Sequence, residues 1–248
     1  MKRFAPSGVL LAVWCLAVPA RAGADAADDA IDQLNQRNIE FTPSEFIDLV
    51  FRNDADNLRF FLGAGMNPDT PDEKGTPALI LAATKGLTET VRALLEGKAR
   101  PDLKTSRGWT SLHFACLFGH VETVQALIDG KADVMAENEF GMTPMHLAVQ
   151  ERQVRIVEAL LKAGARADHR SASGISPLSI ALETGQKDLV KLFAGHGYGS
   201  QLAALKSRFA SELAQVAKEE KVRETDRKAK LRKALEAAGG SRDTAHKP

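Results

Sequence analysis

Three side chains in the middle of the sequence could take part in chemistry: His113, Cys116 and His146. Imidazole nitrogens are common metal ligands, and a cysteine thiolate is a nucleophile when a neighbouring histidine or cation lowers its pKa. His113 precedes Cys116 by three residues, so on a helix the two side chains would lie about one turn apart. The sequence therefore raises two hypotheses, a metal site that uses both histidines and a nucleophilic Cys116.

Other signatures of catalysis are missing from the 248 residues. The sequence holds no glycine-rich phosphate loop, no H-E-x-x-H helix and no G-x-S-x-G elbow. Its carboxylates are abundant but scattered. We therefore expect a protein that is not an enzyme and that binds no cofactor.

Composition and charge narrow the class of partner. Apolar residues make up 44% of the chain and charged residues 26%, as in an ordinary soluble globular protein. The formal net charge is only +1, so no global electrostatic field favours nucleic acid or a membrane surface as the partner. We expect neither of them to be the partner.

A period of 33 residues organises the middle of the chain. Glycine, alanine and valine each occupy one column of this period. The columns are Gly75, Gly108, Gly141 and Gly174; Ala82, Ala115, Ala148 and Ala181; and Val91, Val124, Val157 and Val190. Three independent columns with one period indicate a repeat protein.

Each repeat is predicted to contain a turn followed by two short helices. In the fourth repeat Gly141 permits a turn at positive φ, Thr143 can cap a helix, and Pro144 fits the first helical turn. Helical spacing of apolar residues then follows in Met145, Ala148 and Val149, and again in Ile156, Val157, Leu160 and Leu161. Gly164 stands where a left-handed residue ends the second helix.

These units resemble the ankyrin repeat, whose signature is G-x-T-P-L-H-x-A, then G-H, then V-x-x-L-L-x-x-G-A-D. The third repeat matches best, through Gly108, Thr110, Leu112, His113, Ala115, Gly119, His120, Val124 and Leu127. The resemblance covers about residues 41–199. It implies an all-α solenoid of helix-turn-helix units with β-hairpin loops, capped by N- and C-terminal helices, and a protein that binds other proteins.

Five repeats are expected, at about 41–71, 72–104, 105–137, 138–170 and 171–199. The first is diverged, and its Thr42 and Glu45 predict a capping box with Pro43 at the first helical position. Lys98 and Lys131 occupy the column of Gly65, Gly164 and Gly197, each directly after a glycine, and Arg152 replaces the mid-repeat glycine of the fourth repeat. Either the left-handed turn shifts to the preceding glycine, or lysine adopts it at a cost of roughly 1 kcal/mol.

The resemblance gives the histidines a structural role. In the ankyrin signature this histidine bonds to neighbouring turns, and His120 is the histidine of the G-H step. His113 and His146 would lie on successive layers about 10 Å apart, too far for one metal ion bound at about 2 Å. We expect no metal site, and a buried, inert thiol at Cys116.

The first 22 residues predict an export signal. Lys2 and Arg3 precede a short apolar run at 8–18, and Ala20 and Ala22 supply a cleavage pattern. An uncleaved membrane anchor is the alternative, whereas Cys15 after the bulky Trp14 does not fit a lipoprotein. Cleavage predicts a periplasmic monomer without membrane insertion, or, as an alternative, a secreted protein. It leaves Cys116 without a cysteine partner.

The flanks of the repeats are predicted to be helical. Residues 23–40 form an N-terminal helical segment in which Ile31 and Leu34 would cover the first repeat. Residues 200–238 begin as an amphipathic helix, through Leu202, Leu205, Phe209, Leu213 and Val216, that would seal the fifth repeat. Residues 218–233 are highly charged and form either a solvated extension or a docking segment, and 239–248 are expected to be disordered.

The resemblance also predicts where a partner binds. In ankyrin arrays, partners contact hairpin tips and exposed residues of the first helices, on a concave surface. Carried over to this sequence, that pattern selects Trp109, Leu117, Phe118, Phe140, Met142 and Ile175, with Arg107 and Glu139 in a charged rim beside Lys104 and Glu137. These columns need not be apolar, since the second repeat fills them with polar residues. The alternative is that these side chains fold onto neighbouring hairpins and stiffen the array.

We therefore expect a non-enzymatic scaffold of the bacterial envelope that binds an unidentified protein on its concave ankyrin surface. Two alternatives stay open. One is an accessory or protective factor for a periplasmic enzyme, and the other is a secreted effector that binds a host protein.

Overall fold

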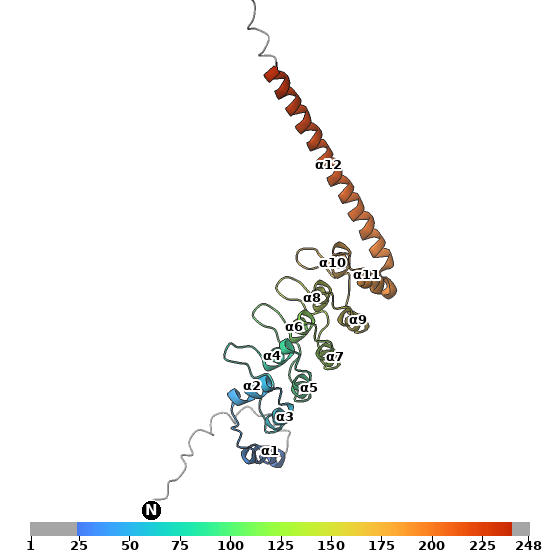
Figure 1. Cartoon of the computed structure of the whole chain (residues 1–248). Helices are drawn as coiled ribbons and strands as arrows, with labels where there is room; N and C mark the ends of the chain where they lie inside the picture. Colours follow the sequence, from blue (N-terminus) through green and yellow to red (C-terminus); the bar gives the residue numbers. More distant parts are fainter. Residues whose placement is uncertain (1–23, 240–248) are drawn as a thin grey trace, which may run out of the picture. The chain divides into compact units, whose positions relative to one another are not determined.

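The structure is a computed structural model that describes residues 24–239, so the predicted export signal lies outside the described residues. The chain divides into two compact units, one that ends at Leu189 and one that begins at Val190. The first unit is built from stacked pairs of short antiparallel helices (Figure 1). The predicted fold class, an all-α solenoid, is confirmed.

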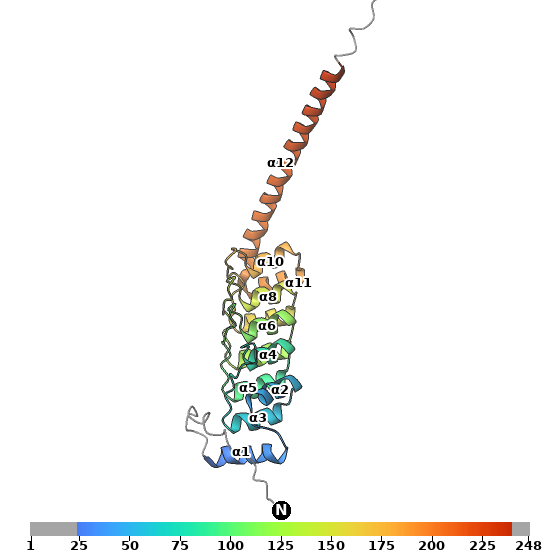
Figure 2. The same cartoon turned by 90° about the vertical axis from the view of Figure 1, so that its left-hand side faces the viewer.

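Two layers of helices make up the first unit. The first helices of the repeats, which we call the inner helices, pack in the order α2 (Pro43–Arg52), α4 (Ala78–Lys85), α6 (Ser111–Phe118), α8 (Pro144–Gln150) and α10 (Pro177–Glu183). Figure 2 shows α4, α6, α8 and α10 stacked one above the next. The second layer consists of α3 (Ala55–Gly63), α5 (Thr88–Glu96), α7 (Val121–Asp129) and α9 (Val154–Lys162), the outer helices. The last repeat continues into α11 (Lys187–Phe193).

Predicted caps begin the inner helices. Thr143 is the N-cap residue of α8 and Pro144 is its first residue, as the sequence indicated. Thr42 Oγ1 accepts a hydrogen bond from the Glu45 N–H at 3.2 Å, with Pro43 at the first helical position. Glu45 itself bonds to Arg52 at 3.1 Å. The reciprocal half of the predicted capping box is absent at α2, because the Thr42 N–H donates to the Glu40 carbonyl at 2.9 Å while the Glu45 carboxylate pairs with Arg52.

The period columns form the core. Ala82, Ala115, Ala148 and Ala181 have no exposed surface, and the same holds for Val91, Val124 and Val157, whereas Val190 is half-buried. An alanine in the middle of each inner helix lets the helices approach closely. Each layer shields its neighbours, so the core runs along the whole array.

Lysine adopts the left-handed turn after two of the outer helices. Lys98 has φ 70° and Lys131 has φ 66°, whereas the preceding Gly97 and Gly130 have φ −72° and −73°. A Cβ on Gly97 would lie 2.7 Å from Leu62 Cδ1, and one on Gly130 would lie 2.7 Å from Leu95 Cδ1. Glycine thus avoids crowding the end of a leucine side chain at one position, and the left-handed conformation falls on the next residue.

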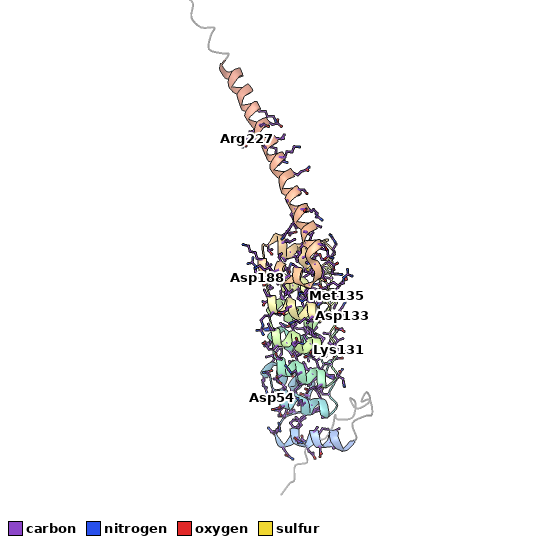
Figure 3. The ribbon with its side chains drawn as sticks, turned by 90° about the vertical axis from the view of Figure 1, so that its right-hand side faces the viewer. Asp54, Lys131, Asp133, Met135, Asp188 and Arg227 are labelled. Atoms are coloured by element: carbon purple, nitrogen blue, oxygen red, sulfur yellow. The ribbon has the colours of Figure 1, made fainter. Side chains whose placement is uncertain are left out.

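Polar contacts tie successive repeats together at the turns that follow the outer helices. Asp69 Oδ1 accepts from the Arg100 N–H at 2.9 Å, and Asp102 Oδ1 accepts from the Asp133 N–H at 2.7 Å. At the next junction Met135 Sδ receives the Arg166 N–H at 3.3 Å in place of a carboxylate. Figure 3 labels Lys131, Asp133 and Met135 in this region. One backbone donor per junction is satisfied in this way.

An additional helix packs beside the first repeat. α1 (Ala24–Gln36) packs against α3, with Leu34 and Ala30 buried and Ile31 half-buried. Its apolar side covers the end of the outer layer (Figure 1).

The second unit contains a five-residue π-helical turn, η2 (Ala194–Tyr198), and the long helix α12 (Gly199–Gly239). Gly197 in the turn has φ 90°. In the predicted amphipathic part of α12, Leu202 is buried and Leu205 and Phe209 are half-buried. The role of this stripe in sealing the fifth repeat stays a prediction. No helix among residues 24–239 has the length and apolar character needed to cross a membrane.

Candidate protein-binding surface

Four loops at 71–77, 104–110, 137–143 and 170–176, which we call the finger loops, precede α4, α6, α8 and α10. A backbone hydrogen bond between residues four apart closes each loop, as from the Asn138 N–H to the Met142 carbonyl at 3.1 Å. Paired strands are reduced to one bridge, between Pro71 and Pro77, among the described residues. The predicted hairpins are therefore tight loops.

The last three finger loops are joined through their backbones. The Glu139 N–H donates to the Arg107 carbonyl at 3.0 Å, and the Ala172 N–H donates to the Phe140 carbonyl at 2.9 Å. A Cβ on Gly141 would lie 2.8 Å from the Ala172 nitrogen, so this glycine permits the close approach of the loops. Side chains on these loops consequently stand on a continuous, hydrogen-bonded support.

The histidines of the signature position hold this support in place. His113 Nδ1 accepts from the Thr110 N–H at 3.2 Å, and its Nε2 bonds to the Met142 carbonyl of the next repeat at 3.0 Å. Because a backbone N–H can only donate, Nδ1 is the acceptor and Nε2 carries the hydrogen. His146 makes the same two bonds, to Thr143 and to the Ile175 carbonyl. Both nitrogens are thus engaged, which agrees with the structural role and leaves no lone pair for a metal ion.

Burial sets the protonation state of these groups. It lowers the pKa of His113 from 6.5 to about 4 and also lowers the pKa of His146. Burial raises the pKa of the Cys116 thiol, which has no exposed surface. A nucleophilic cysteine needs a depressed pKa and access to solvent. The structure therefore contradicts the hypothesis of a reactive Cys116 and agrees with an inert thiol.

Six of the predicted contact residues lie on the finger loops: Arg107, Trp109, Glu139, Phe140, Met142 and Ile175. Phe140 and Ile175 are 51% and 41% exposed, and Trp109 and Met142 are half-buried. Arg107 Nε lies 3.7 Å from Glu139 Oε1 across two loops. The structure brings these six residues together as one finger group.

Trp109 combines exposure with packing. Its ring centroid lies 5.3 Å from that of Phe114 and 5.8 Å from that of His113. The alternative that these side chains stiffen the array therefore applies to Trp109 in part, whereas half of the Phe140 side chain faces solvent.

Leu117 and Phe118 lie elsewhere, at the carboxyl end of α6. α6 has eight residues, so this end is about 12 Å from the finger loops. Phe118 is 52% exposed and Leu117 is half-buried. The predicted patch is therefore two groups rather than one.

Phe114, which the sequence analysis missed, lies between the two groups. It is half-buried, it contacts Trp109, and it precedes Phe118 by one helical turn. The residues one and two periods later, Leu147 and Ile180, are buried, whereas Leu81, one period earlier, is half-buried like Phe114. Only the aromatic side chain at this one position signalled a different role.

Comparison with known families agrees with this architecture. A family model described as Ankyrin repeats (3 copies) matches residues 46–138 and 130–204, which is more than half of the chain. The chain belongs to the ankyrin-repeat family. No curated protein matches it. Members of this family typically bind proteins and are not enzymes, so the chain is a protein-binding scaffold.

Proposed function

We propose that the protein binds a partner protein through the finger loops and inner helices of repeats two to five. The observation that carries this proposal is the exposure of Phe140 and Ile175 on backbone-linked loops. Large apolar side chains at such positions are not needed for folding, since the second repeat carries Lys74 and Thr76 in the same columns. Aromatic and aliphatic groups of this kind anchor protein interfaces.

Pre-organisation supports the same proposal. The last three finger loops are fixed to one another, and two of them to the histidines beneath them, so little conformational entropy is lost on binding. Arg107 and Glu139 form an exposed pair beside the apolar residues. Such a rim favours correct orientation of the partner more than it raises affinity.

We further propose that the protein works in the bacterial envelope, in the periplasm. The support is the sequence of residues 1–22, with its basic start, short apolar run and small residues before the cleavage position. Fractionation of cells that express the full chain tests this proposal. A mature form confined to the culture medium would favour the secreted alternative instead.

Capture of a partner from a periplasmic extract tests the binding surface. We expect Trp109→Ala with Phe118→Ala to abolish capture, because the pair removes the largest apolar groups at both ends of α6. Since Trp109 also packs on α6, a second variant, Phe140→Ala with Ile175→Ala, removes side chains that are largely exposed. Circular dichroism checks that the helical content of each variant is unchanged.

Val154→Ala supplies the matched control. Val154 is 38% exposed on the outer helix α9, away from the finger loops. The control is expected to capture the partner as the natural protein does. Undiminished capture by the Phe140→Ala and Ile175→Ala variant would contradict the proposal.

A further inference from the structure

The carboxyl ends of the inner helices lie side by side. A hydrogen bond to the end of the preceding inner helix joins several repeats: Thr90 Oγ1 to Asn53 Oδ1 at 2.9 Å, His120 Nε2 to the Thr84 carbonyl at 3.1 Å, and Gln186 Nε2 to the Val149 carbonyl at 3.0 Å. Two columns of residues therefore follow one another along the array. We call them the helix-end row: Phe51, Thr84, Leu117, Gln150 and Glu183, with Arg52, Lys85, Phe118, Glu151 and Thr184.

Charge changes sign along the helix-end row. The first two repeats contribute the cations Arg52 and Lys85 to this row, and the third contributes Leu117 and Phe118. The last two repeats contribute the carboxylates Glu151 and Glu183. The four charged side chains belong to exposed residues, as does Phe118. Within these two columns an exposed apolar centre thus stands between cations and carboxylates, and the exposed Arg152, outside the columns, directly follows Glu151.

Lys85 is the cation best placed to meet a partner. Arg52 already pairs with Glu45 at 3.1 Å and with Asp48 at 3.6 Å. Lys85 Nζ lies over the Phe51 ring, 4.5 Å from its centroid, which keeps the ammonium on the helix-end row. Three successive repeats therefore present one cation, one aromatic side chain and one carboxylate along the row, in the order Lys85, Phe118 and Glu151.

The spacing of the row fits a helical ligand. Packed helices lie about 8–10 Å apart, which is the distance from one repeat to the next. Residues seven apart on a partner α-helix are separated by about 10.5 Å on one face. Side chains on one face of an extended strand recur at about 6.8 Å, which does not match the repeat.

We propose that the helix-end row binds a partner α-helix that presents an acidic, a large apolar and a basic side chain at seven-residue intervals. The acidic side chain faces Lys85, the apolar one packs on Phe118 and Leu117, and the basic one faces Glu151. This inference rests on the proposed function and specifies the partner. The apolar centre supplies most of the affinity, and the exposed charges select the sequence.

Fluorescence anisotropy with three labelled helical peptides tests the inference on the full chain. Each peptide has about 21 residues, three heptads, with Glu–Leu–Lys, Glu–Leu–Glu or Lys–Leu–Lys at seven-residue intervals in an alanine–glutamine background. We expect the Glu–Leu–Lys peptide to bind roughly three- to tenfold more tightly than either same-sign peptide, because each of those replaces one exposed attraction with a repulsion.

Charge reversals in the protein should exchange these preferences. Lys85→Glu places a carboxylate on each side of the apolar centre in the adjacent repeats, so the Lys–Leu–Lys peptide should become the tightest ligand. Glu151→Lys places a cation on each side of it, so the Glu–Leu–Glu peptide should become the tightest ligand. The matched control is Asp129→Lys, since Asp129 is exposed at the carboxyl end of the outer helix α7, the end away from the row, and its reversal should leave the order unchanged.

Three results would overturn the inference: no binding by any peptide, an order that Lys85→Glu does not change, or an order that Asp129→Lys changes equally. A Glu–Leu–Lys peptide with a central proline cannot form the helix, and equal binding by it would exclude a helical ligand. Each of these outcomes can be distinguished from a failure of the proposed function, because capture of a partner is measured separately through Phe140 and Ile175.

Discussion

His113 lies without exposed surface between two repeats, and its ring bonds to both of them. Protonation would place a second N–H on Nδ1, towards which the Thr110 N–H already points. Burial and hydrogen bonding therefore both favour the neutral ring. At the scale of the residue, this histidine couples the stability of the array to pH.

We expect the protein to lose stability as the pH falls from 6.5 towards 4. The folded pKa of His113 is lowered to about 4 from 6.5, so its contribution is fully present above 6.5 and is lost below that value. For this residue alone the free energy of unfolding should fall by about 2 kcal/mol between pH 7 and 5. His146, whose pKa is also lowered, adds to the loss.

Urea unfolding at pH 7 and pH 5 measures this effect. His113→Asn is the control variant, because its side chain does not titrate. It should be less stable at pH 7 and should show a smaller difference between the two pH values. Equal differences in the variant and the natural protein would contradict the assignment to His113.

The orientation of single side chains could not be predicted from the sequence. The 33-residue period predicted the layers because equivalent positions meet the same neighbours in each copy. It could not show that Trp109 packs on Phe114 whereas Phe140 faces solvent, since both lie on finger loops. Trp109 packs on Phe114 and His113 of its own repeat, and a column of equivalent positions does not record which side chains of one repeat meet.

At the scale of the element, the ends of the outer helices combine two conflicting demands. At Gly97 and Gly130 a Cβ would crowd the ends of the Leu62 and Leu95 side chains of the preceding repeat. The left-handed turn then falls on Lys98 and Lys131. Elsewhere the turn falls on glycine, as at Gly164 with φ 90°, after an alanine.

We expect Lys98→Gly to stabilise the protein by about 0.5–1 kcal/mol, because it removes the strain of a side chain at positive φ. Gly97→Ala should destabilise it by about 1–3 kcal/mol, since its Cβ would crowd Leu62. Thermal and urea unfolding of the two variants measure both changes. A loss of stability in Lys98→Gly would show that the lysine side chain contributes more than its backbone costs.

The sequence predicted these elements better than their mutual distances. Caps, stripes and terminal glycines placed the helices, because each signal is local. It did not predict that Leu117 and Phe118 stand one helix length from the finger loops. The separation arises because α6 runs from the finger loop at its amino end to Leu117 and Phe118 at its carboxyl end. The choice of exposed positions from the sequence does not include this distance.

At the scale of the whole molecule, each repeat contacts only its neighbours, and an end needs a cover. α1 provides one for the outer layer through Leu34, which is 1% exposed. Damage at this end should therefore stay local, whereas damage in the centre should reach both sides.

We expect Leu34→Ala to cost about 2–4 kcal/mol of local stability. Hydrogen exchange should show faster exchange in α1 and the first repeat and unchanged protection in α6 and α8. Leu127→Ala, in the buried centre of α7, is the comparison and should speed exchange in the flanking repeats too. Uniform loss of protection in Leu34→Ala would mean that the array unfolds as one cooperative unit.

The enclosed thiol of Cys116 has a further consequence. It is the one cysteine among residues 24–239, and its raised pKa keeps it protonated as well as shielded. An alkylating reagent can reach it only when the third repeat separates from its neighbours. The rate of alkylation therefore reports how often the centre of the array opens, without any engineered label.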